Sequence, residues 1–328
     1  MRRRDFLAAA AVQAGALASA GAASKLVLSN LPAFARPSTT AESTNTLKQM
    51  ALGLLILPAH GPEATISRVK ELGFTNCFFS LDDYIDKFTP ALAEEIKGLL
   101  EKYGITATTA EVVGPGRRTW NFLDGPSTIG LVPRETRAAR IDALKQTSDF
   151  AKLVGIGRVQ THCGFIPENP RDPLYEETVL AIQEVAKHCA NNGQDFLMET
   201  GQETPTTMAR AIKDVNQPNL GVGLDTANLI LYGKANPVDA VDIIGPHVKS
   251  IHAKDGKWPT NPMELGEEVL IGTGLVDFKQ VFTKLHKLGY TGAVTIERET
   301  EGPQQIEDVK QEKIYLERIL AQVQNGNA

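Results

Sequence analysis

Four side chains that can bind a metal ion stand in series in the second half of the chain. Glu199, Asp225, His252 and Glu297 are separated by 26, 27 and 45 residues, and each ends a short segment in which apolar and other side chains alternate, broken only by Lys249. Three carboxylates and one imidazole form a hard donor set. It suits one divalent ion such as Mn²⁺, Mg²⁺ or Co²⁺ better than a closed zinc site, although Zn²⁺ is also compatible, and it leaves positions open for substrate oxygens. Each acid alone could instead cap a following helix, but four in series favour a common site.

Strand-like and helix-like segments alternate from residue 49 onward, and the four side chains fall at strand ends. The strands are expected at 51–57, 76–80, 105–113, 158–163, 194–199, 220–225, 247–253 and 293–297. Eight strand–helix units in about 280 residues fit a (β/α)8 barrel, whose strand ends surround one axis. A doubly wound open sheet is the alternative, but no GxGxxG follows an early strand. We therefore predict an α/β, single-domain (β/α)8 TIM barrel over residues 49–322, followed by a short tail, 323–328.

Two long segments interrupt the alternation at 114–133 and 255–276. Both follow predicted strands, so they belong to the same face of the barrel as the four side chains. We expect them to cover a bound substrate.

The N-terminus is typical of a twin-arginine export signal. Arg2-Arg3-Arg4-Asp5-Phe6-Leu7 precedes an Ala/Gly/Leu-rich run that is too short and too mildly apolar for a membrane span. We predict that residues 1–35 are this signal and residues 36–48 a linker, a frayed basic tail being the alternative. The mature protein is then expected in the periplasm or outside the cell, without stable membrane anchoring.

The net charge argues against a nucleic-acid binder, and the cysteine content argues against a disulfide-stabilised fold. Removing residues 1–35 takes away four of the 34 basic residues and one of the 39 acidic ones, which leaves a net charge of −8. Such an acidic chain lacks the electrostatic footprint of a nucleic-acid binder. Cys77, Cys163 and Cys189 are odd in number and widely spaced, so they give no disulfide framework. Cys77 and Cys163 fall inside predicted strands, which indicates buried thiols.

The segments around the four side chains resemble the motifs of the xylose isomerase-like TIM-barrel superfamily, which includes sugar isomerases, sugar epimerases and family-2 AP endonucleases. The similar segments are Met198-Glu199-Thr200, Gly223-Leu224-Asp225-Thr226-Ala227-Asn228, Ile251-His252-Ala253-Lys254-Asp255-Gly256, Thr295-Ile296-Glu297 and the run from Gly272 to Phe278. By layout the resemblance covers residues 49–322.

The resemblance implies roles for the four side chains. In the ketose 3-epimerases of the group, the matching Glu, Asp, His and Glu hold one divalent ion, and the two glutamates face opposite sides of the reacting carbon. Carried over, Glu199, Asp225, His252 and Glu297 are metal ligands, and Glu199 and Glu297 are also the catalytic acid/base pair. Removing a proton next to a carbonyl, through an enediolate, needs a Lewis acid on the carbonyl oxygen. Inverting the carbon needs a base on one face and an acid on the other.

Departures from the epimerase pattern mean that the identity of the substrate cannot be carried over from that group. Asn228 replaces a substrate-binding His, Trp258 replaces an Arg, and Thr273 replaces a Glu. Asn228 and Trp258 are therefore predicted to contact the substrate in the places of those residues.

Four further side chains are predicted to contact the substrate. His162 and Glu111 lie at the inward ends of the fourth and third strands, and Lys254 shares the inward side of His252. Trp120 stands in the loop 114–133 and could close over a sugar face. The alternatives are core hydrogen bonds for His162 and Glu111 and an exposed loop aromatic for Trp120.

These patterns favour a divalent-metal-dependent sugar isomerase or epimerase acting on a small-molecule sugar. A metal-dependent lyase or hydratase acting on oxidised sugars or glycosides is the alternative. An AP endonuclease is disfavoured by Asn228 and by the negative charge, and a non-catalytic sugar-binding barrel by the presence of both glutamates. The oligomeric state stays open, a homo-oligomer being compatible with the sequence.

Overall fold

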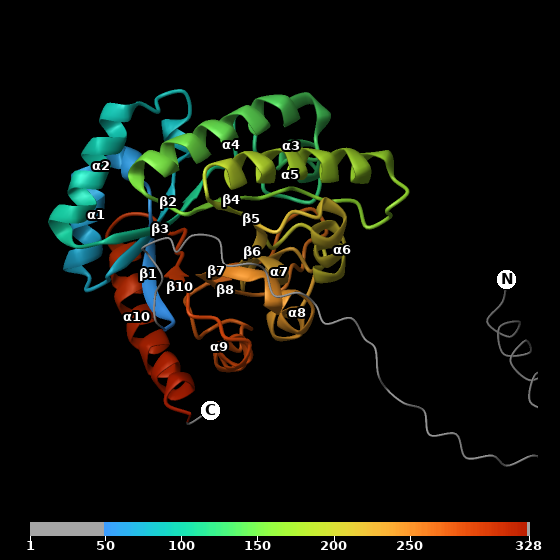
Figure 1. Cartoon of the computed structure of the whole chain (residues 1–328). Helices are drawn as coiled ribbons and strands as arrows, with labels where there is room; N and C mark the ends of the chain where they lie inside the picture. Colours follow the sequence, from blue (N-terminus) through green and yellow to red (C-terminus); the bar gives the residue numbers. More distant parts are fainter. Residues whose placement is uncertain (1–48, 327–328) are drawn as a thin grey trace, which may run out of the picture. The chain divides into compact units, whose positions relative to one another are not determined.

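Eight parallel strands close into a barrel in the computed structural model, which describes residues 49–326. The strand order around the barrel is β1-β10-β7-β6-β5-β4-β3-β2, and the helices surround it (Figure 1). The barrel strands are β1 (Ala51–Ile56), β2 (Asn76–Ser80), β3 (Thr106–Glu111), β4 (Arg158–Thr161), β5 (Asp195–Glu199), β6 (Leu220–Asp225), β7 (Val248–Ala253) and β10 (Ala293–Ile296). The predicted single-domain TIM barrel is confirmed. The predicted export signal and linker lie outside the described residues.

The helices follow the strands, as the alternation of strand-like and helix-like segments predicted. They are α1 (Pro62–Glu71), α2 (Pro90–Tyr103), α3 (Gly125–Thr128), α4 (Arg134–Val154), α5 (Pro173–Asn191), α6 (Pro205–Val215), α7 (Asn228–Leu231), α8 (Pro237–Ile244), α9 (Phe278–Lys287) and α10 (Pro303–Gln324), with 3-10 turns at Pro58–His60, Asp82–Tyr84 and Gly245–His247. Five longer helices begin with a side-chain N-cap, such as Thr89 accepting from the amide of Leu92. Within residues 49–326, no helix is both long and apolar enough to span a bilayer.

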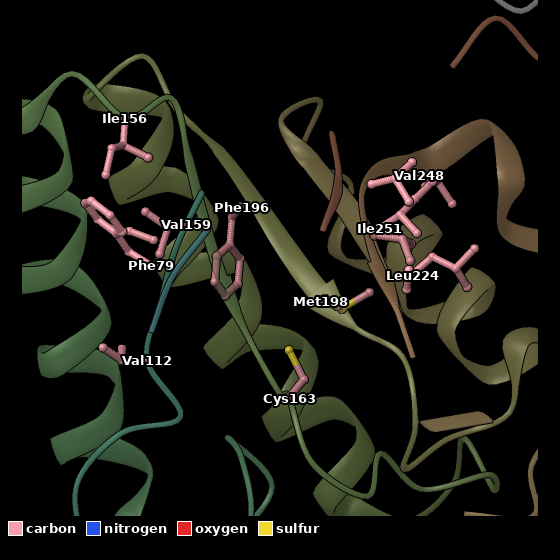
Figure 2. Packing of buried hydrophobic residues seen from close by; sticks show 14 of the residues in the cluster. Phe79, Val112, Ile156, Val159, Cys163, Phe196, Met198, Leu224, Val248 and Ile251 are labelled. Carbon is pink, nitrogen blue, oxygen red and sulfur yellow. The ribbon is translucent and has the colours of Figure 1, made fainter. Parts of the chain in front are cut away.

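The main apolar core lies between the barrel and its helices. Outward side chains of neighbouring strands, such as Leu224 of β6 and Ile251 of β7, are fully buried there beside Val248 (Figure 2). The predicted buried thiols are confirmed, since Cys77 and Cys163 are buried and unpaired, as is Cys189.

The inward side of the barrel is more polar, and glycines make room for its longer side chains. A Cβ on Gly53 would lie 2.0 Å from Oδ1 of Asn76, and a Cβ on Gly223 would lie 2.1 Å from Oε1 of Gln160. Both amides therefore occupy the space that a larger residue in place of the glycine would need.

Each of the two predicted covering segments is held in place by one buried charged side chain. Arg140 of α4 donates to the carbonyls of Pro115, Arg117, Thr128 and Gly130 and so holds the loop 114–133, which includes α3. The second segment contains a small antiparallel pair, β8 (Asp255–Gly256) with β9 (Glu268–Val269). The Asp255 carboxylate accepts from the amides of Gly256, Gly272, Gly274 and Val276.

Candidate metal centre

The barrel register places the four predicted ligands next to one another. Asp225 pairs with His252 across β6 and β7, and Glu199 pairs with Gly223, two residues before Asp225. Glu297 follows the last residue of β10, and its amide still donates to the carbonyl of Ala253 at 3.2 Å. Parallel pairing thus carries four side chains from four adjacent strands to one end of the barrel.

The donor atoms of these side chains converge. Glu199, Asp225, His252 and Glu297 each offer one atom, and all four atoms lie within 4.8 Å of one another. Nδ1 of His252 is 3.3 Å from Oε1 of Glu199 and 3.1 Å from Oε2 of Glu297. Glu199, Asp225 and His252 are almost fully buried. The structure therefore brings together all four residues that the sequence singled out as ligands.

Several of these buried atoms have no hydrogen-bond partner. They are Oδ2 of Asp225, both ring nitrogens of His252 and Oε2 of Glu297. Although Nδ1 of His252 is close to two carboxylates, its direction does not make a hydrogen bond with either. Buried polar atoms are normally paired, because an unpaired one costs about 1–3 kcal/mol. Lone pairs that converge without pairing are what a divalent cation would satisfy, so the donor set fits such an ion.

A second layer of contacts orients the ligands. Gln160 Nε2 donates to Oε2 of Glu199 at 3.0 Å, and Asn228 Nδ2 lies 3.3 Å from Oε1 of the same carboxylate. Oδ1 of Asp225 accepts from the amides of Ala227 and Asn228, each at 2.8 Å. These contacts leave Oδ2 of Asp225 free to face the cluster.

Charge within the cluster sets the ionisation of the two glutamates. Burial alone would raise the pKa of Glu199, but the imidazoles of His162 and His252 outweigh it and hold that pKa well below its usual range. Burial also opposes ionisation of Glu297, yet Lys254 and His252 bring its pKa to about 2. Both glutamates are therefore carboxylates, the form that binds a cation and accepts a proton.

Lys254 is the buried cation of the site. Its ammonium group contacts the carboxylate of Glu299 and lies 3.8 Å from Oε1 of Glu297. Burial alone would lower its pKa, but Glu297, Glu299 and Asp225 raise it well above the ordinary value. Lys254 therefore stays charged beside the cluster.

A cavity of about 650 Å³ opens above the cluster. Five of the six predicted substrate contacts line it, namely Glu111, Trp120, His162, Asn228 and Lys254, together with Glu297. Trp258 does not line it, and its half-exposed ring lies near Gly233 instead. The structure thus gives no support to the predicted contact of Trp258.

His162 and Glu111 lie beside Glu199 on the far side of the cluster from Asp225. His162 Nε2 is 3.3 Å from Oε2 of Glu199 and 4.0 Å from Oε1 of Glu111. The other ring nitrogen contacts the amide of Gln202, and the indole of Trp120 stands edge-on to the ring at 4.9 Å between centroids. Burial and the charge of Glu199 raise the pKa of Glu111 well above its ordinary value.

Several cavity residues were missed by the sequence reasoning. Asp82, Tyr232, Glu268 and Glu299 line the cavity, as does Arg118, whose Nη1 is 2.8 Å from Oδ2 of Asp82. Glu299 follows Glu297 by two residues. In an extended segment this spacing puts both side chains on the same inward side, so Glu299 could have been predicted from the sequence. The others come from turns and short elements whose position depends on tertiary contacts.

Comparison with known proteins relates this chain to one protein family. A family model described as a xylose isomerase-like TIM barrel matches residues 66–319. The ketose 3-epimerase of Arthrobacter globiformis is 23% identical over 252 residues, which are 73% of this chain and 78% of that protein. Two uncharacterised proteins, from Methanocaldococcus jannaschii and Escherichia coli, are 25% and 27% identical over 56% and 44% of this chain, which spans 63% and 45% of their lengths.

Solved structures show the same fold. A xylose isomerase domain protein from Planctomyces limnophilus is 33% identical, with a TM-score of 0.80 over 84% of this chain and 99% of that one. A D-psicose 3-epimerase determined in the presence of D-fructose is 18% identical, with a TM-score of 0.63 over 83% and 99% of the chains. A xylose isomerase-like TIM barrel protein from Mycobacterium smegmatis in complex with magnesium is also 18% identical, with a TM-score of 0.63 over 87% and 99%.

Proposed function

Because this chain belongs to the xylose isomerase-like TIM barrel family, we propose that it is a divalent-metal-dependent sugar isomerase or epimerase. The observation that carries this proposal is the set of unpaired donor atoms on Asp225, His252 and Glu297, of which Glu297 lines a cavity of about 650 Å³. Glu199, Asp225, His252 and Glu297 would hold the ion, for which Mn²⁺, Mg²⁺ and Co²⁺ are the best candidates. When bound, the cation would polarise the carbonyl of the substrate.

Glu199 and Glu297 are the proposed acid/base pair. They project from β5 and from the end of β10, on opposite sides of β6 and β7 in the barrel order. A sugar carbon between them would present one face to each carboxylate. One glutamate would remove the proton next to the carbonyl, and the other would deliver a proton to the opposite face for epimerisation.

The charges of the cavity favour an uncharged sugar as the substrate. The two strongly basic side chains that line it are already paired, Arg118 with Asp82 and Lys254 with Glu299. Binding a phosphate or a sugar acid would require breaking one of these pairs or bringing an anion against Glu268 and Glu299. A free sugar or glycoside also suits the predicted export of the protein to the periplasm or the extracellular space.

Within the cavity, the remaining side chains would position the sugar. Lys254 and Asn228 can donate to substrate oxygens near Glu297 and Glu199. His162 and Glu111 lie on the opposite side of Glu199, and Trp120 offers a half-exposed indole face for a sugar ring.

Hydrogen–deuterium exchange at carbon tests this function. The protein, loaded with Mg²⁺ or Co²⁺, is incubated in D₂O with free ketoses, keto-sugars and glycosides and followed by proton NMR. We expect deuterium to enter next to a carbonyl, and Glu297→Gln to slow this exchange by about 10²–10⁴-fold, the usual contribution of a general base. Glu307→Gln, an exposed glutamate of α10, the helix that follows this loop, is the matched control.

The products separate this function from its competitor. An epimer or isomer would support the proposal, whereas loss of the C–O bond next to the exchanged carbon would identify a lyase or hydratase. Absence of a bound divalent ion, measured by elemental analysis after reconstitution, would refute the metal-dependent mechanism.

A further inference from the structure

A second cavity, of about 600 Å³, lies outside the barrel next to the candidate metal centre. It is a groove between α1 and α10, the helices that flank β1 (Figure 1). Its floor is made by Leu54 and Ile56, whose side chains point outward from β1. Ala64 of α1 and Ile306 of α10 line its two walls.

The groove and the cavity above the metal centre share one wall. Leu55, Leu57, Glu297 and Glu299 line both cavities. Leu57 is 36% exposed, so the upper part of the wall is accessible to a ligand. Since Glu297 borders both spaces, a molecule held at this carboxylate lies next to the groove.

The chemistry of the groove differs from that of the first cavity. The first cavity is lined by carboxylates, Lys254 and His162, which suit sugar hydroxyls. The floor of the groove offers aliphatic carbon, and its rim carries charges of both signs, Arg68 as well as Glu299 and Glu301. An aliphatic floor leaves sugar hydroxyls and charged groups without partners. An uncharged apolar group fits this space.

We propose that the groove is an aglycone subsite, which binds the apolar aryl or alkyl aglycone of a keto-glycoside whose oxidised sugar ring, with its carbonyl, lies at the metal centre. This proposal rests on the proposed function and specifies its substrate as a keto-glycoside rather than a free monosaccharide. The glycosidic oxygen lies over Leu57 and Glu299, and the aglycone packs on Leu54, Ile56 and Ile306.

Matched glycoside pairs test the subsite by binding rather than by turnover. Affinities of the Mg²⁺-loaded full chain are measured by calorimetry for the phenyl and methyl β-glycosides of glucose, galactose and xylose. For each sugar that binds, we expect the phenyl glycoside to bind about tenfold more tightly, because a phenyl group buries more apolar surface than a methyl group.

Two variants fill the groove from opposite walls. Ala64→Trp and Ile306→Trp are each expected to reduce the phenyl-to-methyl affinity ratio to about one. Ala139→Trp, on an exposed position of α4 away from both cavities, is the matched control and should keep the wild-type ratio. Thermal melting of each variant checks that the fold is retained.

Three other outcomes would overturn the subsite. A ratio that persists in both groove variants but is lost in Trp120→Ala would place the aglycone at the mouth of the first cavity and overturn the subsite. Equal affinities of phenyl and methyl glycosides in the wild type, or no binding of any pair, would also overturn it. Deuterium exchange with free ketoses would then show whether the proposed function still stands without the subsite.

Discussion

Asp225 and Asp255 are both completely buried aspartates near strand ends, yet their carboxylates have opposite surroundings. Asp255 accepts from four backbone amides at 2.8–3.1 Å. Asp225 accepts from two amides through Oδ1, while Oδ2 has no partner and faces Glu297 and His252. A buried carboxylate whose two oxygens are both hydrogen-bonded holds the surrounding backbone in place. A buried carboxylate that is held by one oxygen and has the other unpaired is available to a ligand.

Asp225→Asn should show the largest effect, and the effect should fall on chemistry. The amide can still accept from the two backbone N–H groups, but its Nδ2 cannot bind a cation. We expect metal affinity to fall at least about 100-fold. The rate of deuterium exchange should fall by about 1,000-fold, because carbonyl polarisation by a metal is worth several kcal/mol. Elemental analysis and NMR measure both, and unchanged metal content would remove Asp225 from the ligand set.

Asp255→Asn should mainly reduce the stability of the fold rather than the rate of the reaction. Its amide group would point an N–H at backbone N–H donors, and several buried donors would lose their acceptor. We expect the free energy of unfolding of the metal-free protein to drop by about 3 kcal/mol, measured by urea denaturation. In the same assay Asp225→Asn should change stability by less than about 1 kcal/mol. Equal losses in the two variants would contradict the assignment of Asp255 to structure and Asp225 to binding.

The same contrast explains which parts of the site could be read from the sequence. Strand periodicity predicted the inward positions of Glu199, Asp225 and His252, because a barrel converts regular alternation into convergence. Even Glu297, one residue beyond the end of β10, keeps that alternation. The fold followed from the same regularity, since each strand–helix unit repeats a local pattern.

The residues that form the walls of the cavity could not be predicted from strand periodicity. Asp82 and Glu268 reach the cavity from a 3-10 turn and from the small β8–β9 pair, whose positions depend on contacts with distant residues. Trp258 was predicted from its spacing after His252, but the path of this loop is set by Asp255 and β9. Spacing along an irregular loop does not determine where a side chain points.

Glu203 extends the comparison to a third buried carboxyl group. Both of its oxygens are unpaired, and burial raises its pKa to about 8, whereas Glu199, four residues earlier, is kept ionised by imidazoles. The folded protein therefore holds a proton on Glu203 that the unfolded chain releases above its ordinary pKa of 4.5. The stability from this group is fully present below pH 4.5 and is lost as the pH rises through about 8.

Glu203→Gln should remove this part of the pH dependence. We expect the free energy of unfolding of the wild type, relative to that of the variant, to fall by about 2 kcal/mol between pH 5 and pH 7. Urea denaturation of both proteins at the two pH values measures this difference, and other titrating groups cancel between them. A difference that is constant with pH would show that Glu203 is ionised in the folded protein.

Gly223→Ala should have the smallest effect, because it disturbs an orienting contact rather than a ligand. A Cβ at this position would lie 2.1 Å from Oε1 of Gln160, so the amide must move and its hydrogen bond to Glu199 is lost. We expect deuterium exchange to slow by about tenfold, the scale of losses at residues that orient a ligand. If the whole effect passes through Gln160, then Gln160→Ala alone and the double variant should show the same loss, since neither has a side chain to displace. A further loss in the double variant would instead show that Gly223→Ala acts through the backbone between β5 and β6.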